Sequence, residues 1–173
     1  MVVCPDCGYD NIDGDDICQN CEQSLTGLNR PRPATALEGG ILRDRIESLA
    51  PRVPVAVSPE LPVGEVLDLM VTKHIGCVLI VDDGRLVGIF TERDALTRLN
   101  TAAAERAVRP VADFMTHSPV ALALKDKIAF AIHKMALGGY RHVPIVQGNR
   151  PVGVISIRDI LRYAAEKLEA VPS

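Results

Sequence analysis

Two stretches of the chain, residues 54–99 and 119–164, align with each other without a gap at a constant offset of 65 residues. The segment 88–94 (GIFTERD), for example, returns as 153–159 (GVISIRD). An ungapped repeat of this length indicates one supersecondary unit that is used twice. A single unit of this size has too little apolar surface to fold alone, so we expect the two copies to pack together and to form paired clefts.

The residue pattern predicts the same order of elements in both copies, namely strand, helix, strand, strand, helix, and therefore an α+β fold. The apolar run Cys77–Val81 is continuous, as in a buried strand, and Asp83-Gly84 after it is a hairpin turn signal. Apolar spacing also predicts a leading helix at 36–48 and a connecting helix at 101–109. The expected elements lie at 55–57, 63–70, 77–81, 86–91 and 92–99 in the first copy and at 120–124, 128–135, 142–146, 152–156 and 157–168 in the second.

Four of the five cysteines form two C-x-x-C pairs near the N-terminus, Cys4 with Cys7 and Cys18 with Cys21. Four thiolates on two tight turns suit a tetrahedral Zn²⁺ ion, and a site closed by four protein ligands is structural rather than catalytic. This segment has few sizeable apolar side chains, so we expect the metal to supply its folding free energy, on the order of 10 kcal/mol. Residues 4–25 resemble the zinc-ribbon family.

The same cysteines leave alternatives open. Two local disulfides or a redox-active pair would use the same spacing, so a thiol or metal redox sensor is one alternative function. The ligands alone do not separate zinc from iron in a rubredoxin-like setting. The fifth cysteine, Cys77, lies in the apolar strand pattern, and we expect it to be buried and inert.

Charge and composition exclude several classes of partner. The first 29 residues hold six acidic side chains and no Lys or Arg, which disfavours a phosphate backbone, and an aromatic content of 3 % offers few platforms for base stacking. We therefore expect no nucleic-acid binding. No apolar run approaches the roughly 18–20 residues that span a bilayer, and the start of the chain has no signal-peptide pattern. We expect a cytoplasmic chain without membrane contact, whose thiols stay reduced.

Each copy places a hydroxyl residue three positions before an aspartate, where its last strand meets its last helix: Thr91 with Asp94, and Ser156 with Asp159. One interpretation is local, because this is the spacing of a helix capping box. The other is functional, because a carboxylate suits the two hydroxyl donors of a ribose and the free N–H groups of a helix start suit a phosphate. The two interpretations are compatible, since a capped helix end can also hold a ligand.

Four segments together resemble a tandem pair of cystathionine β-synthase (CBS) domains, also called a Bateman module. They are 88–94 (GIFTERD), 153–159 (GVISIRD), 111–116 (VADFMT) and 140–146 (YRHVPIV), and the resemblance covers roughly residues 37–168. It implies two β-α-β-β-α repeats that bind adenine nucleotides or related adenosyl ligands in clefts between them. It also implies a homodimer formed through the CBS pairs. We expect a zinc ribbon at 1–28, a linker at 29–36, the first repeat with its leading and connecting helices at 37–108, and the second repeat at 109–173.

The resemblance also implies roles for particular residues. In this family the aspartate of the strand-to-helix corner binds ribose, the hydroxyl residue supports ribose or phosphate, and adenine commonly lies against the first strand of a repeat. Basic residues before the buried strand, here Arg141 and His142, reach phosphates. Because the first copy has Gly76 and Cys77 at those two positions, we expect two unequal clefts. The predicted nucleotide-binding residues are Thr91, Asp94, Ser156, Asp159, Arg141, His142, Val55, Val57, Val120 and Leu122.

The main hypothesis is a regulatory module that senses AMP, ADP or ATP, or else NAD or S-adenosylmethionine, and signals to a protein partner that the sequence does not name. An alternative is an adaptor, in which the ribbon binds a protein and the CBS pair serves as scaffold. The sequence has no P-loop, and nothing in it suggests His and Asp partners for Ser156, so we expect no enzymatic activity.

Overall fold

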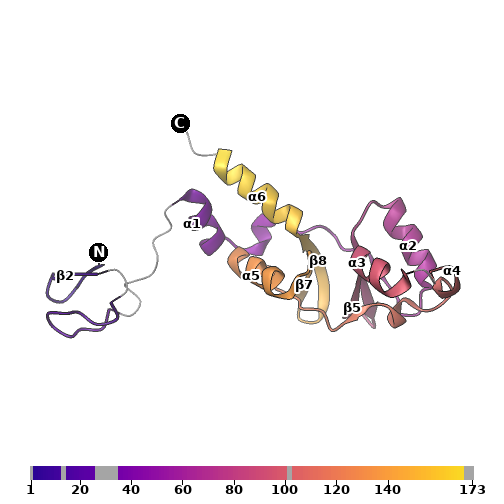
Figure 1. Cartoon of the computed structure of the whole chain (residues 1–173), viewed down its shortest axis with the longest axis horizontal. Helices are drawn as coiled ribbons and strands as arrows, with labels where there is room; N and C mark the ends of the chain where they lie inside the picture. The colour runs from indigo at the N-terminus through magenta and orange to yellow at the C-terminus, as the bar shows by residue number, and fades with distance from the viewer. Residues whose placement is uncertain (1, 13–14, 26–34, 101–102, 170–173) are drawn as a thin grey trace. The chain divides into compact units, whose positions relative to one another are not determined.

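The structure, a computed structural model, describes residues 2–12, 15–25, 35–100 and 103–169 (Figure 1). The chain divides into two compact units, Met1–Thr35 and Ala36–Ser173. Most of the linker predicted at 29–36 lies outside the described residues. Within the described residues, no helix combines the length and the apolar character that crossing a membrane requires.

The first unit is a small two-stranded structure built around the cysteines. Strand β1 (Val2–Val3) pairs antiparallel with β2 (Asp10–Asn11), and an isolated bridge joins Ile17 to Ser24. Its buried apolar cluster consists of Leu25 and two of the cysteines, Cys4 and Cys18. A core this small cannot offset the entropy of ordering the segment, so the unit depends on a cross-link or a metal.

The first repeat follows the predicted order of elements. Strands β4 (Cys77–Asp82) and β5 (Arg85–Thr91) form an antiparallel hairpin. Its turn residues Asp83 and Gly84 have φ of 46° and 75°, as a two-residue hairpin requires. Strand β3 (Ala56–Val57) pairs parallel with β4, and β6 (Thr116–His117) completes the sheet order β3-β4-β5-β6. The elements are β3 (Ala56–Val57), α2 (Val63–Thr72), β4 (Cys77–Asp82), β5 (Arg85–Thr91), α3 (Glu92–Asp94) and a π-helical segment η2 (Ala95–Leu99).

The second repeat has the same order but lacks one predicted strand. The strand expected at 120–124 is reduced to a single parallel bridge between Leu122 and Ile145. It ends there because Asp126 Oδ2 accepts a hydrogen bond from the Ala123 amide at 2.7 Å, which turns the chain away from the sheet. The remaining elements are α5 (Ile128–Gly138), β7 (His142–Gln147), β8 (Arg150–Ser156) and α6 (Ile157–Glu169).

The leading helix predicted at 36–48 is interrupted. Helix α1 (Ala36–Arg43) ends before Arg45, which is extended and bridges to Lys127, and a 3-10 helix η1 (Ile46–Leu49) follows. Residues Ile46 and Leu49 are buried in the core of the second repeat, not of the first. Figure 1 shows α1 beside α5 and α6 accordingly.

The connecting helix predicted at 101–109 is also shorter than expected. Helix α4 spans Ala103–Arg106, and residues 101–102 lie outside the described residues. The carbonyls of Ala107 and Arg109 accept hydrogen bonds from the first amides of α2, those of Gly64 and Val63. These two carbonyls therefore bond to the start of α2 and not to amides of a longer connecting helix. The chain becomes helical again in the short 3-10 helix η4 (Val111–Asp113).

The two repeats are joined by an exchange of flanking segments. Strand β6 (Thr116–His117), which lies before the aligned part of the second repeat (119–164), pairs with β5 of the first. Conversely Arg52, which precedes the first repeat, exchanges both backbone hydrogen bonds with Val154 of β8 at 3.1 and 3.0 Å. The first hairpin also packs against the second repeat. Its side chains Cys77, Leu79 and Ile89 form one apolar cluster with Val154 of β8. The prediction that the copies pack against each other is therefore confirmed.

Candidate functional site

Both strand-to-helix corners hold a buried aspartate tied to the preceding hydroxyl residue. Thr91 and Asp94 form a full capping box, in which Thr91 Oγ1 accepts from the Asp94 amide at 3.3 Å and Asp94 Oδ2 accepts from the Thr91 amide at 3.0 Å. In the second repeat Asp159 Oδ2 accepts from the Ser156 amide at 2.8 Å and from the Ser156 hydroxyl at 2.7 Å. The two aspartates are 8 % and 2 % exposed, so both carboxylates are held in fixed positions.

Asp159 is further surrounded by cations. Its Oδ1 atom lies 2.9 Å from Arg162 Nη2 and 3.3 Å from Arg52 Nη2. Burial alone would raise the pKa of Asp159, but the hydrogen bonds from Ser156 and the charges of Arg52 and Arg162 outweigh it and lower the pKa. The carboxylate is therefore ionised at neutral pH and can accept hydrogen bonds from a ligand.

Asp159 opens on a cavity of about 460 Å³ that residues from both repeats line. The cavity brings together five of the predicted nucleotide-binding residues: Val55, Arg141, His142, Ser156 and Asp159. The other five, Thr91, Asp94, Val57, Val120 and Leu122, do not line it. A cavity of this volume falls in the range of small-molecule sites, which is roughly 300–1,000 Å³.

Three charged residues that line this cavity are missing from the predicted set, namely Arg52, Glu92 and Arg158. Arg158 lies two positions after the corner hydroxyl residue Ser156, and Glu92 lies one position after Thr91. Both are at a helix start, so the repeat alignment could have pointed to them. Arg52 lies before the first repeat in the sequence. It reaches the cavity only because its segment crosses to β8, which no local pattern indicates.

His142 lies between the two repeats against Gly76. A Cβ atom at Gly76 would be only 2.8 Å from His142 Cε1 and 3.4 Å from Glu92 Oε2, so a glycine is needed here for the imidazole to fit. Burial lowers the pKa of His142, and the neighbouring carboxylates of Glu92 and Asp159 oppose this effect only in part. The imidazole is thus neutral at neutral pH and available as a hydrogen-bond partner.

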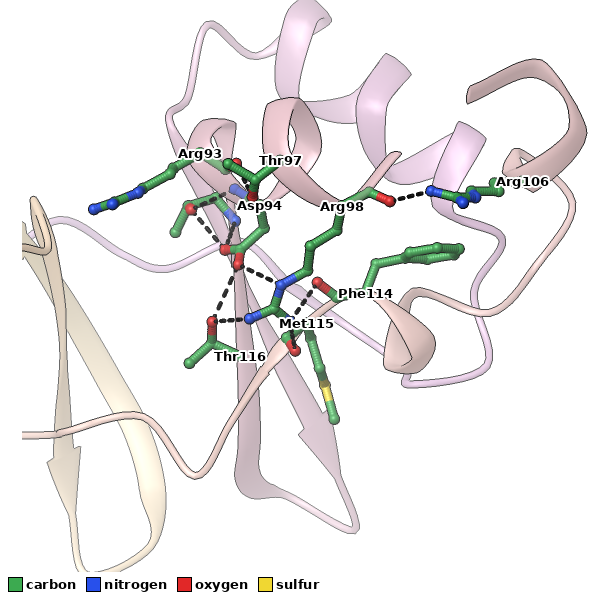
Figure 2. Close-up of polar contacts among 9 residues, drawn as sticks. Arg93, Asp94, Thr97, Arg98, Arg106, Phe114, Met115 and Thr116 are labelled. Atoms are coloured by element: carbon green, nitrogen blue, oxygen red, sulfur yellow. Dashed lines mark hydrogen bonds and ion pairs between the residues drawn. The ribbon is translucent and has the colours of Figure 1, made fainter. Parts of the chain in front are cut away.

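The corner at Asp94 is arranged differently, as Figure 2 shows. Asp94 Oδ1 accepts from the Thr116 hydroxyl at 3.1 Å and lies 3.3 Å from Arg98 Nε. The same guanidinium donates to the carbonyls of Phe114, at 3.0 Å, and Met115, and to the Thr116 hydroxyl at 3.2 Å. Asp94 Oδ1, the carbonyls of Phe114 and Met115 and the Thr116 hydroxyl are therefore all paired within the chain itself.

The four N-terminal cysteines form a candidate metal centre. Their Sγ atoms all lie within 4.8 Å of one another, and the pairs Cys4–Cys21 and Cys7–Cys18 are 3.6 Å apart. Four sulfurs at the usual Zn–S distance of about 2.3 Å form a tetrahedron with edges of about 3.8 Å, so the spacing fits zinc. Burial raises the pKa of Cys18, but backbone N–H groups of Asn20 and Cys21 outweigh it and lower the pKa to about 6, which favours a thiolate ligand.

The two cysteine turns have the same conformation. Gly8 donates its amide to Cys4 O and Glu22 donates its amide to Cys18 O, both at 2.9 Å. Gly8 has a φ of 72° and Glu22 a φ of 59°. The second turn thus adopts the left-handed geometry although it has glutamate where the first has glycine, at the modest cost of a strained non-glycine residue.

Comparison with known proteins agrees with this architecture. The CBS-domain family matches residues 46–101 and 111–166, so the chain belongs to the CBS-domain family. The crystal structure of the CBS-domain protein ATU1752 from Agrobacterium tumefaciens is 30 % identical, with a TM-score of 0.62 over 68 % of this chain and 94 % of that one. Two CBS structures at 22 % identity share the fold. The MJ0100 domain pair in complex with 5-methylthioadenosine and S-adenosyl-L-methionine has a TM-score of 0.62 over 71 % of this chain and 97 % of that one. CBSX2 in complex with AMP has a TM-score of 0.61 over 70 % of this chain and 96 % of that one.

The curated relatives differ in how much of their own length is shared. An uncharacterized 17.7 kDa protein of Acidianus ambivalens is 30 % identical over 121 residues, which is 68 % of this chain and 71 % of that protein. An inosine-5'-monophosphate dehydrogenase of Methanocaldococcus jannaschii is 34 % identical over 110 residues, which is 62 % of this chain but only 21 % of the enzyme.

Proposed function

We propose that this chain is a regulatory module that binds a phosphate-bearing adenosine nucleotide in the cavity beside Asp159. The observation that carries the proposal is that Val55, the pair Arg141 and His142, and the corner of Ser156 and Asp159 line one cavity although three separate segments supply them. The ligands named for the similar structures support it, since these are AMP, S-adenosyl-L-methionine and 5-methylthioadenosine, which share an adenosyl group.

The chemistry of the lining fits each part of such a ligand. The ionised carboxylate of Asp159 suits the two hydroxyl groups of a ribose, and the first turn of the 13-residue helix α6 offers N–H groups to an anion. Val55 and Val53 provide apolar surface for an adenine ring. We assign ribose to the corner, phosphate to the arginines and adenine to the valines.

The charge of the cavity favours phosphate over a sulfonium group. Three arginines line it, Arg52, Arg141 and Arg158, against two acidic residues, Glu92 and Asp159. Arg162 adds a further cation next to Asp159. S-adenosylmethionine carries a positive sulfonium and would meet these cations at close range, whereas AMP, ADP, ATP and NAD place negative phosphate there. We therefore expect the phosphate-bearing ligands to bind more tightly.

A thermal-shift series with AMP, ADP, ATP, NAD and S-adenosylmethionine tests the proposal. A ligand at 100 times its Kd adds about 2.7 kcal/mol to stability, which corresponds to about 5–10 °C in Tm for a chain of this size. Asp159→Ala should abolish the shift. The matched control Asp113→Ala, which removes an exposed carboxylate paired with Arg109, should keep it. No shift with any ligand, in protein shown to be free of bound nucleotide, would overturn the proposal and favour the adaptor hypothesis.

The first unit is the part proposed to hold structural Zn²⁺ and to contact a protein partner. Val3, Tyr9, Ile12 and Ile17 are exposed on it, alongside acidic side chains. Exposed apolar side chains rimmed by polar ones mark protein docking sites when they form one patch, and we propose that these four do so. These exposed residues also support the second candidate function, an adaptor. Whether the chain is a sensor or an adaptor, the acidic side chains of the first unit favour a protein partner with a basic surface. A cytoplasmic location and the absence of catalysis stay predictions.

We also propose that two copies associate through the helices of the repeats. Leu96 and Leu161 occupy equivalent positions in the two repeats and are 78 % and 63 % exposed, and Val71 near Leu96 is 73 % exposed. Leu67, Val71 and Leu96 line a groove of about 520 Å³ on the first repeat. Because the apolar positions recur in both repeats, a second copy of this chain is the partner that matches both. Light scattering should give twice the chain mass, and Leu96→Lys should give a monomer.

A further inference from the structure

We infer that each chain holds a single nucleotide, because Arg98 occupies the corner at Asp94 that is equivalent to the nucleotide corner at Asp159. The inference rests on the proposed function and adds its stoichiometry and the residue that sets it. The two corners share the hydroxyl residue, the carboxylate and the strand-to-helix geometry. What differs is the set of groups that face the carboxylate.

The guanidinium of Arg98 is fixed by four partners. It lies 3.3 Å from Asp94 Oδ1, and it donates to the carbonyls of Phe114 and Met115 and to the hydroxyl of Thr116. Figure 2 shows it inserted between Asp94 and the segment 114–116. A ribose at this corner would have to replace Arg98, and its two hydroxyl donors could not serve the carboxylate and the two carbonyls together.

The second repeat cannot form the same closure. The residue equivalent to Arg98 is Tyr163, whose hydroxyl donates at 2.6 Å to Asp44, which lies between α1 and η1. The residue equivalent to Thr116 is Pro51, which has no hydroxyl group. The side chain that blocks Asp94 is thus replaced at Asp159 by one that packs away from the corner.

The two arginines that do reach Asp159 are held less firmly than Arg98. Arg52 and Arg162 each donate to Asp159 Oδ1 through one Nη2 atom, and their side chains are 61 % and 49 % exposed. Neither guanidinium has a backbone carbonyl partner among the hydrogen bonds of the described residues, whereas Arg98 has two. They can therefore turn toward a phosphate without leaving a carbonyl unpaired, and Asp159 remains open to ligand.

Equilibrium dialysis of the full chain with radiolabelled AMP tests the inference by counting bound AMP per chain at saturation. We expect one AMP for the parent, none for Asp159→Ala, and two for Arg98→Ala, since removing the guanidinium frees Asp94. The double variant Arg98→Ala/Asp159→Ala should bind one. The matched control Arg85→Ala removes an exposed arginine at the start of β5 and should leave one AMP bound.

The outcomes separate the inference from the proposed function. Two AMP per parent chain, or one remaining in Asp159→Ala, would overturn the inference and leave nucleotide binding intact. One AMP in folded Arg98→Ala would also overturn it. No AMP in any variant, together with no thermal shift from ADP, ATP or NAD, would overturn the proposed function and this inference with it; if one of these nucleotides shifts the parent and AMP does not bind, the same count is made with that nucleotide. Arg98→Gln, which loses the charge but keeps an N–H donor, replaces Arg98→Ala if circular dichroism shows that the alanine variant does not fold, and the same two-AMP expectation applies.

Discussion

The hydroxyl of Tyr163 donates a hydrogen bond to Asp44 Oδ2 at 2.6 Å, and this bond ties the last helix of the second repeat to the segment that precedes the first. Lys167 Nζ lies 3.3 Å from the same carboxylate oxygen. A Cβ atom at Gly40 would be 2.2 Å from the Tyr163 hydroxyl, so α1 can approach α6 this closely because glycine stands there. The N-terminal and C-terminal segments of the module are thereby held together.

Tyr163→Phe is expected to lower the free energy of unfolding by about 1.5–3 kcal/mol. The variant keeps the buried ring but removes the donor to an ionised carboxylate, and hydrogen bonds to charged groups are worth about this much. Urea unfolding followed by circular dichroism measures it. Tyr140→Phe, at a half-buried ring in the same repeat, should change stability by less than about 0.5 kcal/mol. Equal effects in both variants would show that the Tyr163 bond contributes nothing.

Alignment of the two repeats was enough to predict the fold class and the corner residues, because an ungapped repeat fixes equivalent positions in space. The resemblance to CBS domains implied the roles of Arg141 and His142, which do line the cavity with Ser156 and Asp159. The elements and the corners were predicted from short-range patterns. The prediction of a strand at 120–124 was wrong beyond Leu122, because the side chain of Asp126 accepts a hydrogen bond from the Ala123 amide and turns the chain there.

The residues that distinguish the two corners could not be predicted in the same way. Arg52 reaches Asp159, and Thr116 reaches Asp94, only because each segment crosses to the last strand of the other repeat. Arg98 and Tyr163 occupy equivalent positions in the repeat alignment, yet Arg98 contacts Asp94 whereas Tyr163 contacts Asp44. Such differences arise from tertiary packing around the repeat, and a local motif carries no signal for them.

Asp159→Asn should reduce stability by about 2 kcal/mol at pH 7, because the charged acceptor of the Ser156 and arginine hydrogen bonds is lost. The pKa of Asp159 is lowered on folding, so its charge adds stability above the unfolded value of about 3.9. That contribution is lost as the pH falls through the folded pKa. Urea unfolding between pH 7 and pH 2.5 should show the difference between parent and variant constant above about pH 5 and shrinking below pH 4.

The control for this series is Asp82→Asn, at an exposed position at the end of β4. It should differ from the parent by less than about 0.5 kcal/mol at each pH. A difference between Asp159→Asn and the parent that stays constant down to pH 2.5 would contradict the prediction, because it would mean that folding does not lower the pKa of Asp159.

His142→Gln should remove a separate loss of stability at mildly acidic pH. Burial lowers the pKa of His142 in the folded chain, so below the unfolded value of about 6.5 the unfolded chain takes up a proton that the folded chain does not. Parent stability therefore falls as the pH drops from about 6.5 toward the folded pKa. The variant should lack this fall, and His133→Gln on the exposed side of α5 should retain it. Parallel curves for the parent and His142→Gln between pH 8 and pH 5 would refute the assignment.

Removal of the metal should unfold the first unit and leave the second intact. Among the described residues, the apolar cluster of the first unit is only Leu25 with Cys4 and Cys18, so we expect a bound ion to supply its stability, about 10 kcal/mol for structural zinc. Elemental analysis should give one zinc per chain in the parent and in Cys77→Ser, and none in Cys18→Ser. After chelation, amide NMR signals of residues in the first unit should collapse to unfolded positions while those of the β4–β5 hairpin stay. Iron in place of zinc, or a dispersed ribbon spectrum without metal, would show that the four thiols are not a structural zinc site.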